Sequence, residues 1–171
     1  LLMWSDVQIQ NELPWKRKHL NSIKMSYGKT PFFKEIYSDI ELLYKNECDS
    51  LLDFILPIIC YAFEKFDVTA PIKRTSDLIK EGHVLSGKKS DFIISMCRTC
   101  NAKSFVFGTL GRDYIEREKF ADIIPVFQDF THPTYKQIHG EFVSNMSFID
   151  LLFNHGSESK NILQTSNFKY E

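Results

Sequence analysis

Side chains able to do chemistry are concentrated between residues 127 and 156, which read FQDFTHPTYKQIHGEFVSNMSFIDLLFNHG. The stretch holds three histidines and two aspartates, set among Phe, Tyr, Met and Pro. Buried polar side chains without partners cost free energy, so a run that mixes them with aromatic residues indicates a shaped, partly desolvated cleft. We expect a working surface of the protein to include this stretch.

Proton transfer is the chemistry that these residues suit best. A histidine ionises close to neutral pH, and a neighbouring carboxylate can fix its tautomer. His132 or His139 is therefore the candidate general base, and Asp129 is the candidate orienting carboxylate. Tyr135 and Gln137 could hold a sugar or acyl group. The alternative is that these side chains satisfy the backbone of a long loop, with Tyr135 as a core anchor.

A second candidate site is the turn at 108–114, with the sequence GTLGRDY, between an expected strand and an expected helix. Backbone N–H groups at a helix start favour anions, and an arginine can bind a phosphate through two hydrogen bonds. Gly108, Gly111 and Arg112 could therefore bind phosphate or carboxylate. The pattern is not a G-x-G-x-x-G fingerprint, so an ordinary βα turn with Arg112 in a salt bridge is the alternative.

Three further residues are candidates for ligand binding. Asn145 and Asp150 flank the start of a helix expected at 147–154, where Asn145 or Ser147 can cap the first turn. Asp150 is ambiguous, because a carboxylate is favoured in a first helical turn for structural reasons alone. His19 ranks lower, because a histidine on a helix is more often satisfied locally than used as a ligand.

The first half of the chain is expected to be helical. Apolar and aromatic residues recur at helical spacing, Pro14 suits a first turn, and Gly28 supplies a stop. The pattern predicts helices over 14–27, 30–45 and 49–66.

Strand-like and helix-like segments alternate in the second half. They are a β-prone run at 68–72, a helix at 89–100, a strand at 104–107, a helix at 112–121, a strand at 123–127 and a helix at 147–154. This alternation predicts an α/β fold with a helical N-terminal half followed by Rossmann-like βαβ units around a small, mostly parallel sheet. Ligands bind beyond the carboxyl ends of such strands, so both candidate segments should leave one sheet edge and share one pocket.

Length and composition limit the class of protein. The chain has 171 residues, and 43% of them are hydrophobic, which fits one domain. We expect this domain to span residues 1–163 and to be followed by a frayed tail at 164–171. The net charge is −1 and the pI is about 6.6, so no electrostatic footprint for nucleic acid is present. The most apolar segment, 51–63, is interrupted by Asp53 and Pro57, so no membrane span is expected.

The cysteines and histidines indicate neither a metal nor another cofactor. The four cysteines do not follow a secreted disulfide framework, so reduced thiols in the cytoplasm are expected. The single C-x-x-C at 97–100 is weak evidence for zinc or redox chemistry. A site built from His132, His139 and His155 has none of the recognised ligand spacings.

Several segments match one protein family in the same order. They are Trp15 with Lys18-His19-Leu20, Tyr27 with Thr30-Pro31-Phe32-Phe33, Gly111-Arg112-Asp113-Tyr114, and a C-terminal series that includes Phe127-Gln128-Asp129-Phe130, His132-Pro133, Tyr135, Gln137, His139-Gly140 and Ile149-Asp150-Leu151-Leu152-Phe153-Asn154. On these residues the chain resembles the WbqC-like proteins over roughly residues 6 to 163.

The resemblance implies a role in bacterial surface-polysaccharide biosynthesis, such as that of the lipopolysaccharide O-antigen. We expect a transferase that modifies a nucleotide-activated amino sugar by acyl or aminoacyl transfer. His132 or His139 would deprotonate the amine, Asp129 would orient that histidine, and Arg112 with the 108–111 backbone would hold the diphosphate. The alternatives are a non-catalytic glycan- or nucleotide-binding module and a nucleotidyl-transferring α/β enzyme.

One segment typical of the family, Q-P-x-[YF]-x-P-x-x-G-[YF], does not occur in this sequence. The resemblance therefore implies a fragment or a shortened member. We expect such a chain to expose apolar surface on the 14–27 helix or on strand edges, and to self-associate as a possible homo-oligomer.

Overall fold

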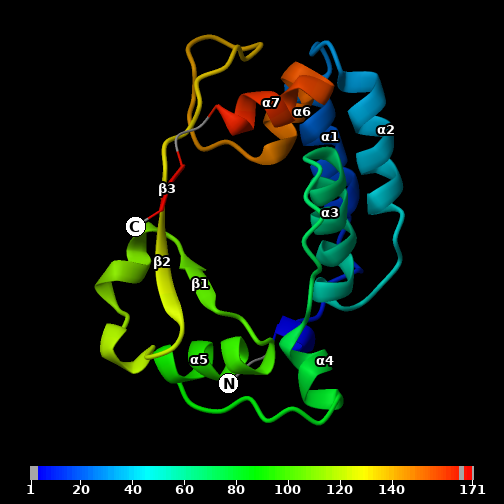
Figure 1. The fold of residues 1–171 in the computed structure, drawn as a ribbon. Coiled ribbons are helices and arrows are strands. Elements are labelled where there is room, and N and C mark those ends of the chain that lie inside the picture. Colours follow the sequence, from blue (N-terminus) through cyan, green and yellow to red (C-terminus); the bar gives the residue numbers. More distant parts are fainter. Residues whose placement is uncertain (1–3, 166–167, 171) are drawn as a thin grey trace. The chain divides into compact units, whose positions relative to one another are not determined.

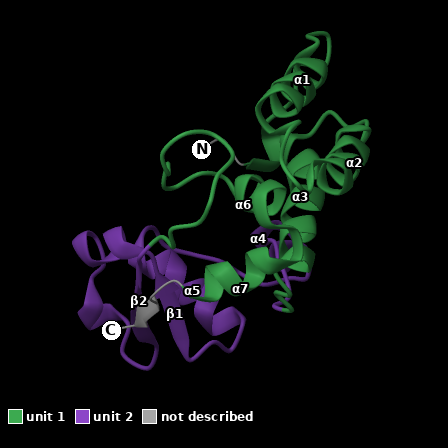
Figure 2. Ribbon diagram, turned by 90° about the horizontal axis from the view of Figure 1, so that it is seen from above, with its two compact units in different colours: residues 1–69, 132–165 green, residues 70–131, 166–171 purple. Residues whose placement is uncertain are grey.

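The computed structural model describes residues 4–165 and 168–170, and in the last of these ranges the backbone alone. The chain divides into two compact units, which Figure 2 shows in different colours. Unit 1 contains residues 1–69 and 132–165, and unit 2 contains residues 70–131 and 166–171. A single domain over 1–163 stays a prediction.

Unit 1 is helical. Its α-helices are α1 (Trp15–Tyr27), α2 (Phe33–Tyr44), α3 (Leu51–Lys65), α6 (Phe148–His155) and α7 (Ser159–Gln164), with short 3₁₀ turns η1 (Trp4–Asp6) and η4 (Gly156–Glu158). Helix α2 contacts α1, α3 and α6 (Figure 1). The three helices predicted in the first half are confirmed, with each end shifted by up to three residues.

The core of unit 1 forms where the apolar stripes of these helices meet. Ile36 and Ile40 of α2 are one turn apart and are buried against Leu152 and Phe153 of α6. The Phe153 ring is fully buried and stacks on Tyr27 of α1, with 4.6 Å between ring centroids. Each buried side chain of this size stabilises the fold by roughly 1.5–3 kcal/mol. The core thus fixes the C-terminal end of α1 against α6.

Gly156 allows α6 to end tightly against the start of α2. Its φ is +54°, a conformation that glycine adopts without steric cost. A Cβ at this position would lie 2.4 Å from Cδ1 of Phe32. The Phe32 backbone N–H donates to the Phe153 carbonyl at 3.3 Å, so backbone and ring pack together here.

The described residues of unit 2 form a small sheet and two α-helices. They are α4 (Thr75–Lys80), α5 (Ser90–Thr99), β1 (Ser104–Phe107), β2 (Ile124–Phe130) and β3 (Phe168–Tyr170). Strand β2 is central: it pairs in parallel with β1, with Phe107 opposite Phe127, and antiparallel with β3. Phe107 and Phe127 pack with Ile94 of α5 in the core of this unit. The predicted α/β class is confirmed: β1 and β2 form a small parallel pair, and the third strand, β3, is antiparallel to β2.

The helix predicted at 112–121 is wrong. The β1–β2 connection instead forms two 3₁₀ turns, η2 (Thr109–Asp113) and η3 (Arg117–Lys119). Ile115, Phe120 and Ile123 pack on the core of unit 2 at intervals of five and three residues. An α-helix presents one face at intervals of three and four. Irregular backbone is therefore needed to bury all three.

The second strand also differs from the prediction. It continues past residue 127 because its last three residues pair with β3, so Gln128 and Asp129 lie inside a strand and do not follow it. Residues 168–170, in the tail that was expected to fray, form β3. The β-prone run at 68–72 forms no strand, and α4 was not anticipated. Pairing with a neighbouring strand, rather than local β propensity, therefore decides which of these segments become strands.

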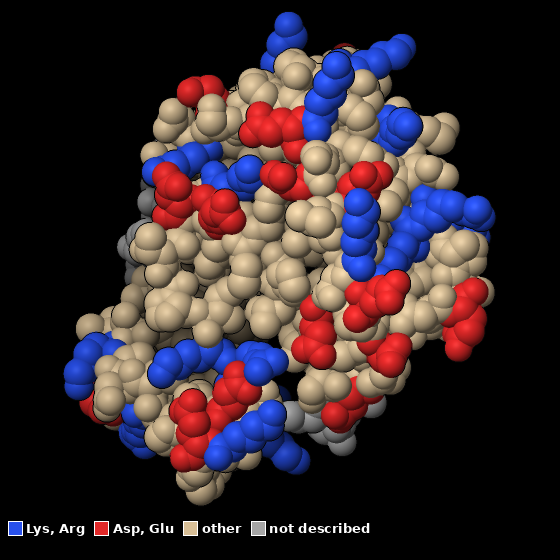
Figure 3. Space-filling view, turned by 90° about the vertical axis from the view of Figure 1, so that its right-hand side faces the viewer, with Lys and Arg blue, Asp and Glu red and all other residues tan. Residues whose placement is uncertain are grey.

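Charges of both signs intermingle on the face of the molecule shown in Figure 3, in keeping with the net charge of −1. Among the described residues, no helix combines the length and the apolar character that crossing a bilayer requires.

Candidate functional site

A buried carboxylate is the centre of the candidate site in unit 1. Asp150 lies in the first turn of α6, with 5% of its surface exposed. Tyr135 Oη donates to its Oδ2 at 2.8 Å, and Gln137 Nε2 donates to the same oxygen at 2.9 Å. Both donors are neutral, so these hydrogen bonds hold the carboxylate in place without cancelling its charge.

The surrounding loop fixes the orientation of the Gln137 amide. Its Oε1 accepts from the Val143 backbone N–H at 2.8 Å, and its Nε2 donates to the Val143 carbonyl at 2.9 Å. This reciprocal pair determines which side of the amide carries the donors. Gln137 therefore presents a donor to Asp150, as a carboxylate acceptor requires.

A cavity of about 290 Å³ adjoins this carboxylate. It is lined by Ser26, Tyr27, Gln137, Ile138, His139, Val143, Met146 and Asp150. Ser26 and Tyr27 come from the last turn of α1, and the others come from the loop and from α6. None of these eight lining residues is Lys or Arg, so Asp150 supplies the formal charge of the cavity wall.

Two phenols beside Asp150 are kept protonated. Burial, followed by the negative charge of Asp150 and hydrogen bonding to it, raises the pKa of Tyr27 to about 12. Burial and the hydrogen bond to Asp150 also raise the pKa of Tyr135. At neutral pH both hydroxyls therefore act as donors, and Asp150 is their acceptor.

His139 lies in the cavity wall with a defined tautomer. Its Nε2 is 2.7 Å from the backbone carbonyl of Ser26. A carbonyl oxygen can only accept, so Nε2 carries the proton, and in the neutral ring Nδ1 has the lone pair. The His139 side chain is exposed, which leaves the ring accessible to a ligand. This arrangement suits a general base.

The other candidate base, His132, has different surroundings. Its Nδ1 donates to the Pro133 carbonyl at 2.8 Å, and its ring contacts those of Tyr135 and Phe142 at centroid distances of 5.9 and 5.8 Å. His132 does not line the cavity. It therefore packs beside Tyr135, the residue whose hydroxyl donates a hydrogen bond to Asp150.

Asn145 is exposed in the loop before α6. Its φ is +60°, and its amide donates to the Ser144 hydroxyl at 3.2 Å. Ser147 occupies the N-cap position of α6 but makes no side-chain capping bond. Neither residue lines the cavity.

The second predicted segment lies in unit 2. Arg112 and Asp129 form a two-pronged salt bridge, with N–O distances of 2.9 and 3.1 Å. The guanidinium also lies 5.0 Å from the centre of the Phe127 ring. Gly111 packs closely on β1, because a Cβ there would lie 2.5 Å from Phe107 Cβ. Arg112 thus forms the salt bridge that the alternative interpretation of this turn anticipated.

The proposed residues therefore divide between the units. Tyr135, Gln137 and Asp150 form one hydrogen-bonded group in unit 1, and Gln137, Asp150 and His139 line the cavity beside it. Gly108, Gly111, Arg112 and Asp129 belong to unit 2, so a single pocket shared with the histidines stays a prediction.

Sequence reasoning missed Ser26 and Tyr27. Tyr27 was named only as part of the family pattern; its ring packs on the core of unit 1, and its hydroxyl donates to Asp150. No local pattern connects the end of α1 with a carboxylate on α6.

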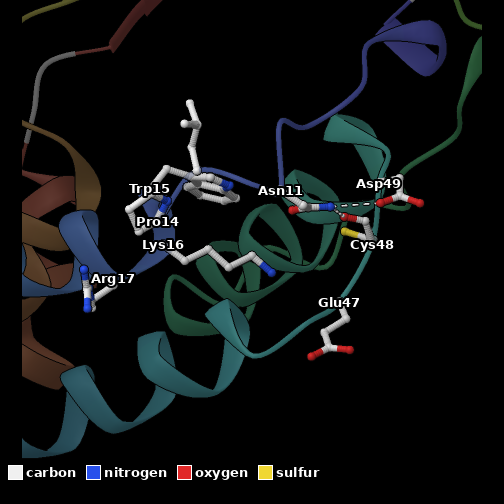
Figure 4. Close-up of a pocket in the computed structure, with 9 residues that line it drawn as sticks. Asn11, Pro14, Trp15, Lys16, Arg17, Glu47, Cys48 and Asp49 are labelled. Carbon is white, nitrogen blue, oxygen red and sulfur yellow. Dashed lines mark hydrogen bonds between the residues drawn. The ribbon is translucent and has the colours of Figure 1, made fainter.

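A larger cavity of about 580 Å³ lies at the start of α1 (Figure 4). Two of its polar side chains are hydrogen-bonded: the Asn11 amide donates to Asp49 Oδ1 at 2.9 Å, and Lys16 Nζ donates at 2.5 Å to the carbonyl of Asn46, which does not line the cavity. Arg17 points away from the other side chains in this view. This mixed lining favours no single class of ligand.

His19, the remaining candidate, lines a separate cavity next to it. Its Nδ1 is 3.4 Å from the Tyr44 hydroxyl, and its ring contacts the Trp15 indole edge-to-face with 5.4 Å between centroids.

Comparison with known proteins identifies the family. The model of the WbqC-like protein family matches residues 3–162. The chain is also similar to a Mycobacterium tuberculosis protein described as "Uncharacterized protein Rv1507c", with 24% identity over 157 residues. This match covers 88% of the chain and 64% of that relative, so the chain spans less than two thirds of its length. No solved structure matches significantly. Because the family model covers nearly the whole sequence, the chain belongs to the WbqC-like protein family.

Proposed function

We propose that this protein acts in bacterial surface-polysaccharide biosynthesis and transfers an acyl or aminoacyl group to the amine of a nucleotide-activated amino sugar. The observation that carries the proposal is the buried Asp150 carboxylate, which faces a small cavity and is bonded there by neutral donors. Family membership supports the pathway. The cavity supports an amine as the group that reacts.

Charge favours an amine at this position. A buried carboxylate is costly unless a positive group or good hydrogen bonds compensate it. Tyr135 and Gln137 supply two hydrogen bonds to Oδ2, and a protonated amine in the cavity would add the missing charge. A cavity of about 290 Å³ is at the small end of ligand sites, so it suits one sugar ring rather than a whole sugar nucleotide.

This arrangement suits acyl transfer to the amine. Asp150 holds the ammonium group, and one proton passes to Nδ1 of His139. The free amine attacks the acyl carbon of the donor, a C–N bond forms, and the bond to the leaving group breaks. A second proton from the nitrogen departs with the leaving group, and the third stays on the amide. The binding of a diphosphate by Arg112 and the 108–111 backbone, which belong to unit 2, stays a separate prediction.

A cytoplasmic location is part of the same proposal. The four cysteines are free thiols, which is the usual state of cysteines in a reducing compartment.

The test is incubation with a panel of nucleotide-activated amino sugars, their hydroxyl counterparts and acyl donors, followed by mass spectrometry. We expect a mass gain on the amino sugars alone. His139→Gln should reduce the rate by about 100-fold or more, the usual contribution of a general base. His155→Gln is the matched control, because His155 Nε2 also donates to a loop carbonyl, that of Lys136 at 2.9 Å, but the ring does not line the cavity.

Other results would select the alternatives. Amine binding without a mass gain would favour a non-catalytic glycan- or nucleotide-binding module, and pyrophosphate release would favour nucleotidyl transfer. Equal transfer to hydroxyl sugars, or full activity of His139→Gln, would overturn the assignment of Asp150 and His139.

A further inference from the structure

An aromatic cavity of about 430 Å³ lies beside the first two turns of α1, within unit 1. We propose that it binds the base of the nucleotide that carries the sugar. This inference rests on the proposed function for the identity of the rest of the ligand, but the cavity itself can be tested without it.

Four rings meet at this cavity: Trp15, His19, Tyr44 and Phe54. Trp15 contacts Phe54 edge-to-face with 5.0 Å between ring centroids, and Tyr44 contacts Phe54 in the same way at 5.3 Å. Phe54 is buried and forms part of the core, whereas Trp15 and Tyr44 are half-buried. Partly exposed aromatic surface beside a cavity is a platform on which a planar ring can stack.

Charge selects a neutral ring as the occupant. The cavity is lined by Gln8, Ile9, Gln10, Leu13, Trp15, His19, Tyr44, Leu51, Phe54 and Ile55, with no Lys, Arg, Asp or Glu among them. The Lys16 ammonium lies 5.7 Å from the Trp15 ring centre and 5.4 Å from that of Phe54. Because this ammonium group already lies near the two rings, a second cation in the cavity would be repelled, whereas a neutral ring that carries an anionic group would be attracted.

Polar side chains at the rim of the cavity can form hydrogen bonds with the edge of a base. Gln8 and Gln10 are exposed, and each amide offers both donors and an acceptor, the combination that matches the edge of a purine or pyrimidine. The Tyr44 hydroxyl and the His19 ring add two further polar groups near the stacking surface.

Helix α1 relates this cavity to the one beside Asp150. Trp15 and His19 line the aromatic cavity from its first two turns, and Ser26 lines the amine cavity from its last turn. At 1.5 Å per residue, Trp15 and Ser26 are about 16 Å apart along the helix axis, and all three lie on one side of it. Such a separation suits a ligand with a base at one end, a diphosphate between and an amino sugar at the other.

The test uses free nucleosides, which carry neither the amine nor the phosphates. Uridine, thymidine, adenosine and guanosine are titrated into the whole chain by calorimetry, each with the wild type and with His19→Ala, Trp15→Phe and Asp150→Asn. We expect at least one nucleoside to bind. His19→Ala should weaken this binding about tenfold or more, as loss of one stacking partner would, and Trp15→Phe should weaken it less, because a smaller ring remains. Asp150→Asn should leave the binding of nucleosides unchanged. Thermal unfolding checks that each variant is folded.

The outcomes separate this inference from the proposed function. If no nucleoside binds, or if His19→Ala and Trp15→Phe bind as tightly as the wild type, the base site is overturned, whatever the transfer assay shows. If nucleosides bind as expected but no sugar is modified, the base site stands and the proposed transfer fails. A free amino sugar is titrated in the same way. If it binds more tightly than the nucleosides and its binding is lost in His19→Ala, the base site is also overturned, because the cavity would then be a sugar site.

Discussion

Replacing Tyr135 with phenylalanine removes one hydroxyl and leaves the ring in place. That hydroxyl donates to the Asp150 carboxylate at 2.8 Å, and Tyr135 is only 8% exposed. A hydrogen bond to a charged group contributes about 1.5–3 kcal/mol, and the buried acceptor loses one of its neutral donors and keeps Gln137 and Tyr27. Tyr135→Phe should therefore lower the free energy of unfolding by about 1.5–3 kcal/mol. The melting temperature should fall by roughly 3–12 °C for a chain of this length.

Urea unfolding followed by circular dichroism measures this loss. Tyr114→Phe is the control, because Tyr114 is 53% exposed and its hydroxyl should contribute little. The same substitution in an Asp150→Asn background completes a double-mutant cycle, and we expect a coupling energy of about 1 kcal/mol or more between the two side chains. A loss below about 0.5 kcal/mol, or additive effects in the cycle, would refute the view that Tyr135 holds a charged Asp150.

Three further predictions concern the backbone, pH and the turn after β1. Gly156→Ala should cost about 2 kcal/mol or more, because the new Cβ would meet Phe32 at a positive φ; a variant as stable as the wild type in urea would contradict this packing. The pKa of Tyr27 is about 12 in the folded protein against an ordinary value of 10, so the unfolded chain ionises first. The stabilisation from the Tyr27 hydroxyl should thus be complete below pH 10 and lost between pH 10 and 12, and an equally steep loss in Tyr27→Phe would show another cause. Arg112→Ala should raise the dissociation constant of the sugar nucleotide at least tenfold by calorimetric titration, and unchanged affinity in the folded variant would remove Arg112 from the site.

The sequence predicted the helices of unit 1 well, because each buries one apolar stripe at the spacing that an α-helix imposes. Ile36 and Ile40 are one turn apart on α2, and both are buried. The β1–β2 connection was predicted less well. Its apolar residues pack on the core of unit 2, although the backbone there is irregular. The spacing of apolar residues along the sequence cannot predict a segment of this kind.

The candidate site was predicted in part. The loop and its residue types pointed to Tyr135, Gln137 and His139, and all three contribute to the group around Asp150 or to its cavity. The sequence could not choose between the two histidines, since both stand in the same loop. The distinction comes from their partners: the Ser26 carbonyl for His139 and the Pro133 carbonyl for His132.

The amino-acid sequence by itself determined the helical first half, the α/β class and the family, because these depend on local spacing and on the order of motifs along the chain. Tertiary structure alone decided that Asp150 is a buried acceptor rather than an ordinary first-turn carboxylate, and that His139 carries its proton on Nε2. The Ser26 carbonyl that fixes this tautomer is 113 residues away in the chain. Contacts over such a separation depend on how α1 packs against α6 and its loop, which no window of neighbouring residues encodes.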